Sequence, residues 1–159
     1  MARGDWIARM DADDLSLTGR IGKQLDAVES DSGVVTCGVE VIDSCGEGME
    51  RYVAWVNSLE SSEVMMRSRF IESPVINPTA MVRRDWMLRV GGYHEVNWAE
   101  DHDLWLRLME FGCPFVRVPE GMHAVRFRIL ASDREIISQD VEFTAALTPG
   151  DCVVTHAML

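Results

Sequence analysis

The sequence predicts an α/β fold, in which strands and helices alternate along the chain and pack in layers. Short apolar runs rich in β-branched residues indicate the strands, and segments with apolar residues three or four positions apart indicate the helices. The chain has 159 residues, of which 47% are hydrophobic and 26% are charged. That is enough for one domain with a substantial core and too little for two large ones.

The first half of the chain contains two predicted strands with a helix between them. Residues 6–10 form a short, mostly apolar run that is followed directly by a cluster of aspartates. Thr18 is the candidate N-cap of the helix, which has apolar residues at i, i+4 and i+7 counted from Ile21. The valine-rich run 34–42 is the second predicted strand.

Three short elements are predicted in the middle of the chain. Residues 61–71 are expected to be helical, opened by a serine and ended before Pro74. A strand is predicted over 79–82, and a short helix over 85–90 is ended by two glycines. No helix or strand is predicted for residues 49–60.

The clearest predicted helix lies in the second half of the chain. Asn97 and Glu100 have the spacing of a capping box, which places the helix start at Asn97. Gly112 favours the end of the helix, and a strand over 115–118 is expected to stop before Pro119. The buried face of the helix is predicted to consist of Leu104, Trp105, Leu108 and Met109.

The composition excludes several classes of protein. A formal net charge of −11 argues against binding to nucleic acid or to anionic lipid, both of which need a basic surface. No apolar run reaches the roughly 18 residues of a membrane span, and no signal peptide is visible, so a cytoplasmic location is expected. The four cysteines form no CxxC pair, which favours free thiols over a zinc site.

A first group of candidate functional residues follows the strand at residues 6–10. Asp11, Asp13 and Asp14 lie where ligands bind in α/β sheets, beyond the carboxyl end of a strand. Carboxylate oxygens at positions i and i+2 suit Mg²⁺ or Mn²⁺, which can bridge to a diphosphate. The alternative is an acidic turn in which the aspartates only cap the backbone, because a bare DxD is a weak motif.

A second group is the run from Glu100 to Asp103, near Tyr93, Trp98 and Trp105. A carboxylate beside aromatic walls has its proton affinity raised, as a general base requires. The alternative is that these acids only complement the helix N-terminus. By itself this group favours the alternative, and Trp105 is expected to be plain core.

The two acidic groups, with the segment between them, resemble a family 2 glycosyltransferase of the GT-A fold. The resemblance extends over roughly residues 2–119, and its motifs are specific only when taken together and in order. The segments that carry it are 6–14 with Arg20 and Gln24 downstream, 77–81, 91–93 and 100–107. It implies a GT-A-like mixed sheet flanked by helices.

The resemblance implies a nucleotide-sugar donor and an inverting, metal-dependent transfer to an acceptor hydroxyl. Asp13 would be the main ligand of Mn²⁺ or Mg²⁺, with Asp11 beside it on the ribose and diphosphate side of the donor. Asp14 would complete the donor-binding group by orienting the other two. The implied acceptor is a glycan, a lipid-linked sugar or another hydroxyl compound, and the chain could associate with a membrane through its acceptor.

On the acceptor side, the resemblance implies that Asp101 is the general base. It would take the proton of the acceptor hydroxyl as that oxygen attacks the anomeric carbon. Glu100, Asn77 and Trp98 would line the acceptor side, with Asn77 on the floor between donor and acceptor and Trp98 stacking on a sugar face.

The family's domain begins with a nucleotide-binding half that has no counterpart in this sequence. Residues 1–121 are therefore expected to form the C-terminal part of a GT-A domain, which holds the metal and the acceptor. Such a truncated copy would leave an exposed edge strand in the sheet, and a partner chain could supply the missing half. Residues 122–159 form a divergent tail with a helix over 134–147 and a strand over 152–155.

Two other functions compete with this reading. The chain could be a non-catalytic remnant of the glycosyltransferase fold. A haloacid-dehalogenase-like phosphohydrolase also places DxD after a strand, but its chemistry needs a lysine well downstream. The one lysine of the chain, Lys23, is too near the aspartates for that role.

Overall fold

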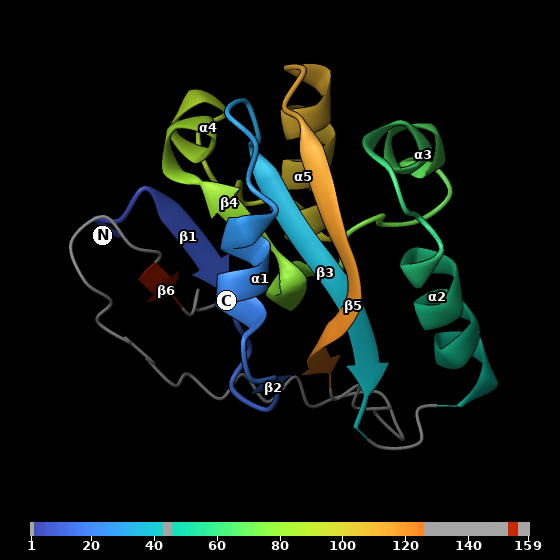
Figure 1. The fold of residues 1–159 in the computed structure, drawn as a ribbon. Helices are drawn as coiled ribbons and strands as arrows, with labels where there is room; N and C mark the ends of the chain where they lie inside the picture. Colours follow the sequence, from blue (N-terminus) through green and yellow to red (C-terminus); the bar gives the residue numbers. More distant parts are fainter. Residues whose placement is uncertain (1, 43–45, 126–152, 156–159) are drawn as a thin grey trace.

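The computed structural model describes residues 2–42, 46–125 and 153–155. In this part of the chain, six strands form one sheet in the order β2-β5-β3-β4-β1-β6 (Figure 1). The strands are β1 (Trp6–Arg9), β2 (Leu15–Ser16), β3 (Val34–Val41), β4 (Met81–Arg83), β5 (Phe115–Val125) and β6 (Val153–Thr155). The helices are α1 (Arg20–Asp26), α2 (Glu47–Asn57), α3 (Ser62–Ser68), α4 (Arg84–Arg89) and α5 (Glu100–Glu110), with the 3₁₀ turn η1 (Asn77–Thr79) before β4.

The sheet is mixed. β3 is parallel to β5 and β1 is parallel to β6, whereas β4 runs antiparallel between β3 and β1. β2 pairs antiparallel with β5 at the opposite edge. A mixed sheet flanked by helices is the fold that the sequence predicted, and it is confirmed.

The hydrophobic core has two parts, one on each face of the sheet. The larger part packs residues of α2, α3 and α5 against β3, β4 and β5, and the smaller part packs α1 against the other face (Figure 1). Trp105 is fully buried in the larger part, edge-on to Phe115 at 6.4 Å between ring centroids. Its predicted place in the core is confirmed, as is that of the other three residues of the α5 stripe.

Buried polar side chains of α1 connect three elements of the sheet layer. Gln24 donates hydrogen bonds from Nε2 to the carbonyl oxygens of Val35 (2.8 Å) and Thr79 (2.9 Å). Arg20 donates from Nε to Gln24 Oε1 (3.0 Å) and from Nη2 to the carbonyl oxygen of Arg9 (3.1 Å). Both side chains are almost fully buried. α1 is therefore fixed to β1, β3 and η1 by hydrogen bonds as well as by apolar contact.

Two predicted helix starts are wrong. The N-cap of α1 is Gly19, at a φ of 83°, and not Thr18; no side chain caps this helix. α5 begins at Glu100 after Ala99, so the capping box proposed for Asn97 does not form. The first turn of α5 carries three acids instead, and their charges complement the helix dipole without a side-chain cap.

Two other elements differ from prediction. The run predicted to end before Pro119 continues to Val125, because the pairing of β3 with β5 shifts register around residue 38 and absorbs the extra residues. α2 was not predicted. Val53 and Val56 of this helix are buried with Leu59 beyond its end, a spacing of three that is typical of an amphipathic helix.

The strand predicted over 152–155 is confirmed over 153–155, and its position is informative. β6 pairs with β1 through Ile7↔Val153, Ala8↔Val154 and Arg9↔Thr155. β1 is therefore an inner strand, flanked by β4 and β6. The helix predicted over 134–147 lies outside the described residues.

No described helix is both long enough and apolar enough to cross a lipid bilayer. β5 crosses residue 121, so it includes the first residues of the predicted tail. The proposed boundary between 121 and 122 stays a prediction.

The hydrogen bonds of Gln24 lead to a prediction about stability. Gln24→Ala leaves two buried carbonyl oxygens without their donor, so we expect the free energy of unfolding to fall by about 3 kcal/mol. Urea denaturation of the whole chain measures this. Asp26→Ala, at an exposed position of the same helix, is the control and should change stability by less than about 0.5 kcal/mol. A Gln24→Ala protein as stable as the control would contradict the anchoring role of this side chain.

Candidate functional site

The three aspartates occupy the turn after β1, but their environments differ. Asp11 is half-exposed and its Oδ1 lies 3.1 Å from Nη2 of Arg9. Asp13 is half-buried, whereas Asp14 is buried. The backbone N–H of Asp14 donates to the carbonyl oxygen of Asp11 at 3.3 Å, which closes the turn. The loop therefore presents two accessible carboxylates and turns the third inward.

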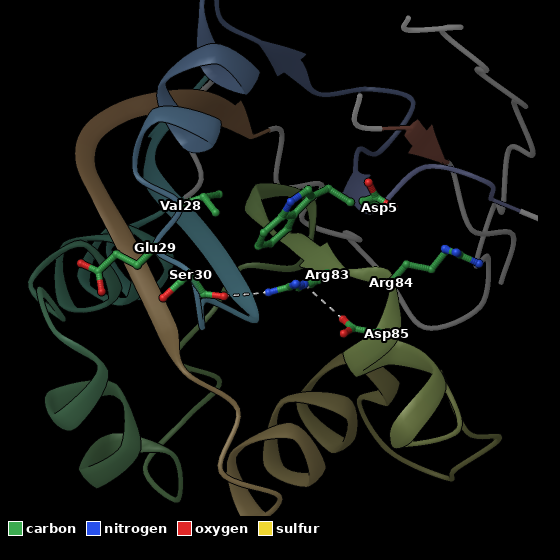
Figure 2. A pocket seen from close by; sticks show the side chains of 8 residues that line it. Asp5, Val28, Glu29, Ser30, Arg83, Arg84 and Asp85 are labelled. Carbon is green, nitrogen blue, oxygen red and sulfur yellow. Dashed lines mark hydrogen bonds and ion pairs between the residues drawn. The ribbon is translucent and has the colours of Figure 1, made fainter. Parts of the chain in front are cut away.

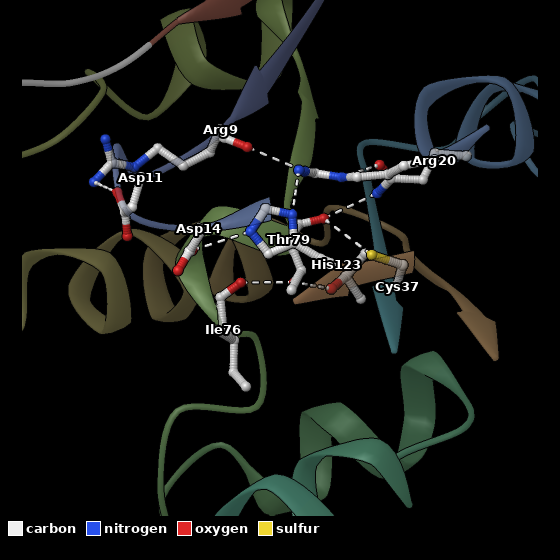
Figure 3. A network of polar contacts seen from close by, with 10 residues as sticks. Arg9, Asp11, Asp14, Arg20, Cys37, Ile76, Thr79 and His123 are labelled. Atoms are coloured by element: carbon white, nitrogen blue, oxygen red, sulfur yellow. Dashed lines mark hydrogen bonds and ion pairs between the residues drawn. The ribbon is translucent and has the colours of Figure 1, made fainter. Parts of the chain in front are cut away.

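The inward carboxylate is held by a histidine from β5. Asp14 Oδ2 lies 3.0 Å from Nε2 of His123, and the His123 side chain is fully buried. Nδ1 of His123 lies 2.7 Å from Nη1 of Arg20 (Figure 3). Burial lowers the pKa of His123, although the hydrogen bond to Asp14 opposes that effect.

Asn77 connects the aspartate loop to the region of the second acidic group. Its amide fits its neighbours when the oxygen accepts from Nε (3.1 Å) and Nη2 (3.3 Å) of Arg9 and the nitrogen donates to the Tyr93 hydroxyl (2.8 Å). The same Arg9 side chain pairs with Asp11. A continuous series of polar contacts therefore runs from Asp11 through Arg9 and Asn77 to Tyr93.

The charges of the second acidic group also affect the pKa of Tyr93. Burial raises the pKa of Tyr93 to about 12. Arg9 acts to lower that pKa, whereas the carboxylates of Asp101 and Glu100 raise it further. This partly buried phenol thus lies within electrostatic range of Arg9, the partner of Asp11, and of the two acids at the start of α5.

Asp101 lies in the first turn of α5 in a partly desolvated position. Burial raises the pKa of this carboxyl, and the charge of Glu100 adds to the effect. The backbone N–H of His102 donates to Asp101 Oδ1 at 2.8 Å and partly offsets the rise. Burial also raises the pKa of Tyr52, to which the charges of Glu72 and Asp101 contribute. A raised proton affinity is the property that a general base near neutral pH needs.

His102 and Trp98 surround the start of α5. Nε2 of His102 lies 2.8 Å from the carbonyl oxygen of Arg69, so this histidine connects α5 to the end of α3. The indole of Trp98 lies edge-on to the His102 ring, at 5.6 Å between centroids, and is 48% exposed. The exposed Trp98 is available to a ligand, whereas Trp105 is not.

The donor set of the loop can be compared with what a divalent cation needs. The described residues contain no group of three or more His, Cys, Asp or Glu side chains that could hold a metal ion. Asp11 and Asp13 supply two hard carboxylate groups. That set fits Mg²⁺ or Mn²⁺ in the common arrangement in which one or two carboxylates bind the ion together with substrate phosphates and water.

A pocket of about 400 Å³ lies elsewhere in the molecule. It is lined by Asp5 before β1, by Glu29 after α1, and by Arg83 and Asp85 around the start of α4 (Figure 2). Nε of Arg83 lies 3.4 Å from Asp85 Oδ1, an ion pair within the lining. The pocket is at the beginning of β1, whereas the aspartate loop follows the end of that strand, so the pocket is separate from the candidate site.

Sequence reasoning missed two residues that organise the site. Arg9 was regarded only as part of the apolar strand, although its guanidinium lies between Asp11 and Asn77. His123 lies in the region assigned to a divergent tail, and a single histidine between apolar residues gives no sequence signal. An arginine within an otherwise apolar run, two positions before Asp11, was the available signal for Arg9.

The comparisons with known proteins agree with this architecture. The family model described as glycosyl transferase family 2 matches residues 1–91. An amylovoran biosynthesis glycosyltransferase, AmsE, of Erwinia amylovora is 32% identical over 120 residues, which are 76% of this chain and 44% of that protein. An O-antigen biosynthesis glycosyltransferase, WbnJ, of Escherichia coli is 32% identical over 112 residues, 70% of this chain and 42% of that protein.

The mixed sheet flanked by helices agrees with a partial domain of the GT-A type, and the matched family and relatives are glycosyltransferases. The chain belongs to glycosyltransferase family 2. It spans less than half the length of the curated relatives that it matches.

The environment of Asp101 leads to a prediction about pH and stability. Because burial holds the folded-state pKa above the ordinary 3.8, the native state binds more protons than the unfolded state between the two values. The ionised carboxylate therefore destabilises the fold fully above the raised pKa, and this destabilisation fades as pH falls below it. We expect Asp101→Asn to be more stable than the wild type at pH 7, with a difference that shrinks toward pH 4.

Urea denaturation of both proteins between pH 7 and pH 4 tests this expectation. Asp103→Asn on the same helix is the matched control. It weakens the 2.7 Å contacts from Arg107 to Asp103 and should lower stability at pH 7. Equal stability of Asp101→Asn and wild type at every pH would contradict a desolvated Asp101.

Proposed function

We propose that this chain provides the metal- and acceptor-binding part of an inverting glycosyltransferase. The reaction transfers a sugar from a nucleotide-sugar donor to an acceptor hydroxyl. The observation that carries the proposal is the series of contacts from Asp11 through Arg9 and Asn77 to Tyr93, within electrostatic range of Asp101. It supports one shared site for two acidic groups that are 90 positions apart in the chain, counted from 11 to 101.

On the donor side, Asp13 and Asp11 would hold Mn²⁺ or Mg²⁺ at the diphosphate. When bound, such an ion neutralises negative charge on the departing nucleoside diphosphate. Arg9 keeps the Asp11 carboxylate oriented through their 3.1 Å ion pair. Asp14 belongs to the same donor-binding loop, and its buried carboxylate supports the role of orienting the other two.

On the acceptor side, Asp101 would act as the general base. The acceptor oxygen forms a bond to the anomeric carbon while its proton passes to the Asp101 carboxylate. The bond from that carbon to the diphosphate oxygen breaks with its electron pair, and the opposite face of attack inverts the configuration. Burial and the charge of Glu100 raise the pKa of Asp101, which makes it a stronger base than an exposed aspartate.

Asn77 and Trp98 would shape the acceptor site. Asn77, buried between Arg9 and Tyr93, forms the floor between donor and acceptor. The exposed indole of Trp98 offers an apolar face for a sugar ring. The acceptor class that we propose is a glycan or lipid-linked sugar, reached from the cytoplasm and, for a lipid-linked acceptor, at the membrane surface.

We further propose that residues 1–121 are the metal and acceptor half of the domain and that a partner polypeptide can complete the nucleotide site. The phosphohydrolase alternative is set aside, because the chain belongs to a glycosyltransferase family. The non-catalytic remnant is an outcome of the experiment below.

Donor binding is the first test. The purified chain is titrated with UDP-, GDP- and dTDP-sugars, with and without Mn²⁺, and heat and tryptophan fluorescence are followed. We expect binding to one donor that requires Mn²⁺ and is lost in Asp13→Ala, because that variant lacks a cation ligand. Asp26→Ala, also a loss of one aspartate, should bind as the wild type does. A folded wild-type chain that binds no donor would support the remnant instead.

Transfer is the second test. Asp101→Asn should bind the donor nearly as well as the wild type but lower the transfer rate by about 10²–10⁴-fold, the usual contribution of a general base. For the wild type, kcat/KM should fall as pH decreases through the raised pKa of Asp101, since the protonated carboxyl cannot accept a proton. Radiolabelled sugar incorporation into a glycan acceptor measures both. Full transfer by Asp101→Asn would rule out this base.

A further inference from the structure

His123 is buried between two charged groups that come from distant parts of the chain. Its Nε2 lies 3.0 Å from Asp14 Oδ2 and its Nδ1 lies 2.7 Å from Arg20 Nη1, and the side chain has no exposed surface (Figure 3). A guanidinium can only donate hydrogen bonds, so Nδ1 must accept from Arg20. Nε2 then carries the proton and donates it to Asp14. This arrangement fixes one tautomer of a neutral imidazole.

Together, these side chains hold both ends of the aspartate loop. Arg20 donates from Nη2 to the carbonyl oxygen of Arg9, the last residue of β1, at 3.1 Å. The same guanidinium donates to His123, which in turn donates to Asp14. Arg9 and Asp14 are therefore connected through two buried side chains across the residues between them, and those residues include Asp11 and Asp13.

The geometry of β5 brings His123 to this position. From Cys37 to Val39, β3 advances two residues, whereas the paired part of β5 advances five, from Val118 to His123. Irregularities of this kind re-aim side chains beside functional sites. His123 also lies outside residues 1–91, the region that the family model matches. Neither the DxD motif nor the family match points to this residue.

We propose that His123 is a positioning residue that fixes the loop of Asp11 and Asp13 in the geometry needed to bind a cation and a nucleoside diphosphate. Asp14 is the anchor through which it acts. The expected effect of His123 on cation and nucleotide binding rests on the proposed function. Its expected effect on the order of the loop does not depend on that function. Groups that orient metal ligands typically change metal affinity or activity by about 10–100-fold when they are replaced.

Two variants of similar size separate the contact with Asp14 from the contact with Arg20. His123→Gln carries an amide nitrogen near the former Nε2 and can still donate to Asp14. His123→Asn can accept from Arg20 but is too short to reach Asp14. Both variants place one amide in the same buried position. A difference between them in loop order or in ligand affinity therefore reports the contact with Asp14.

The experiment uses the full chain and two readouts. Hydrogen exchange of the backbone amides of residues 11–16, followed by mass spectrometry, reports the order of the loop without any ligand. Calorimetric titration with UDP, GDP and dTDP in the presence of Mn²⁺ reports the binding site. Thr36→Val is the control, because it removes the 2.6 Å contact between the buried hydroxyls of Thr36 and Thr79, a contact that involves neither His123 nor Asp14.

We expect His123→Asn to exchange the loop amides at least tenfold faster than the wild type and to lower Mn²⁺-dependent nucleotide affinity by about 10–100-fold. His123→Gln should stay within about threefold of the wild type in both readouts. Thr36→Val should lower the melting temperature but leave loop exchange and nucleotide affinity unchanged, so stability loss alone cannot produce the expected pattern.

Other outcomes are decisive as well. Equal loop exchange in His123→Asn and wild type would overturn the positioning role, as would loosening of the loop in His123→Gln. If His123→Asn does not fold, the loop exchange of His123→Gln decides. Faster loop exchange in His123→Asn, with no nucleotide bound by any protein including the wild type, would support the anchor and refute the proposed function.

Discussion

The buried guanidinium of Arg20 is the interaction on which the rest of this structure depends. A buried charge is costly unless it is hydrogen-bonded, and Arg20 donates to Gln24, to the carbonyl oxygen of Arg9 and to His123. The same bonds fix α1 to the sheet and define where β1 ends. Because the aspartate loop begins at that point, the packing of one helix sets the position of the candidate metal ligands.

A second constraint is the polar connection across the site. Arg9 and Asn77 are buried, so each must find partners inside the protein, and they bond to each other and, through Asn77, to the partly buried Tyr93. This requirement fixes η1, which carries Asn77, between β1 and the segment before α5. Asp101 then lies in a partly desolvated position that raises its pKa. The same residues thus satisfy buried polar groups and form part of the proposed site.

Prediction from the sequence succeeded where the signal was local and periodic. The stripe that contains Leu104 and Leu108 identified α5, and the apolar run before the aspartates identified β1. It succeeded at the start of α3, where Ser61 is the N-cap, but failed at α1 and α5, because Gly19 and Ala99 precede them without any side-chain cap. It also ended β5 too early, since a proline stops a regular strand but can be accommodated where the register shifts.

The sequence by itself determined the α/β class, the two acidic groups and the family, because strand and helix periodicity and ordered motifs are properties of the chain alone. Only the tertiary structure decided that Asp14 is turned inward, that His123 holds it, and that Arg9 and Asn77 connect the aspartate loop to Tyr93. The physical reason is that these contacts join residues separated by up to 109 positions. Burial and the need for hydrogen bonds decide which residues pair in this way. Neither requirement produces a regular spacing of residues in the sequence.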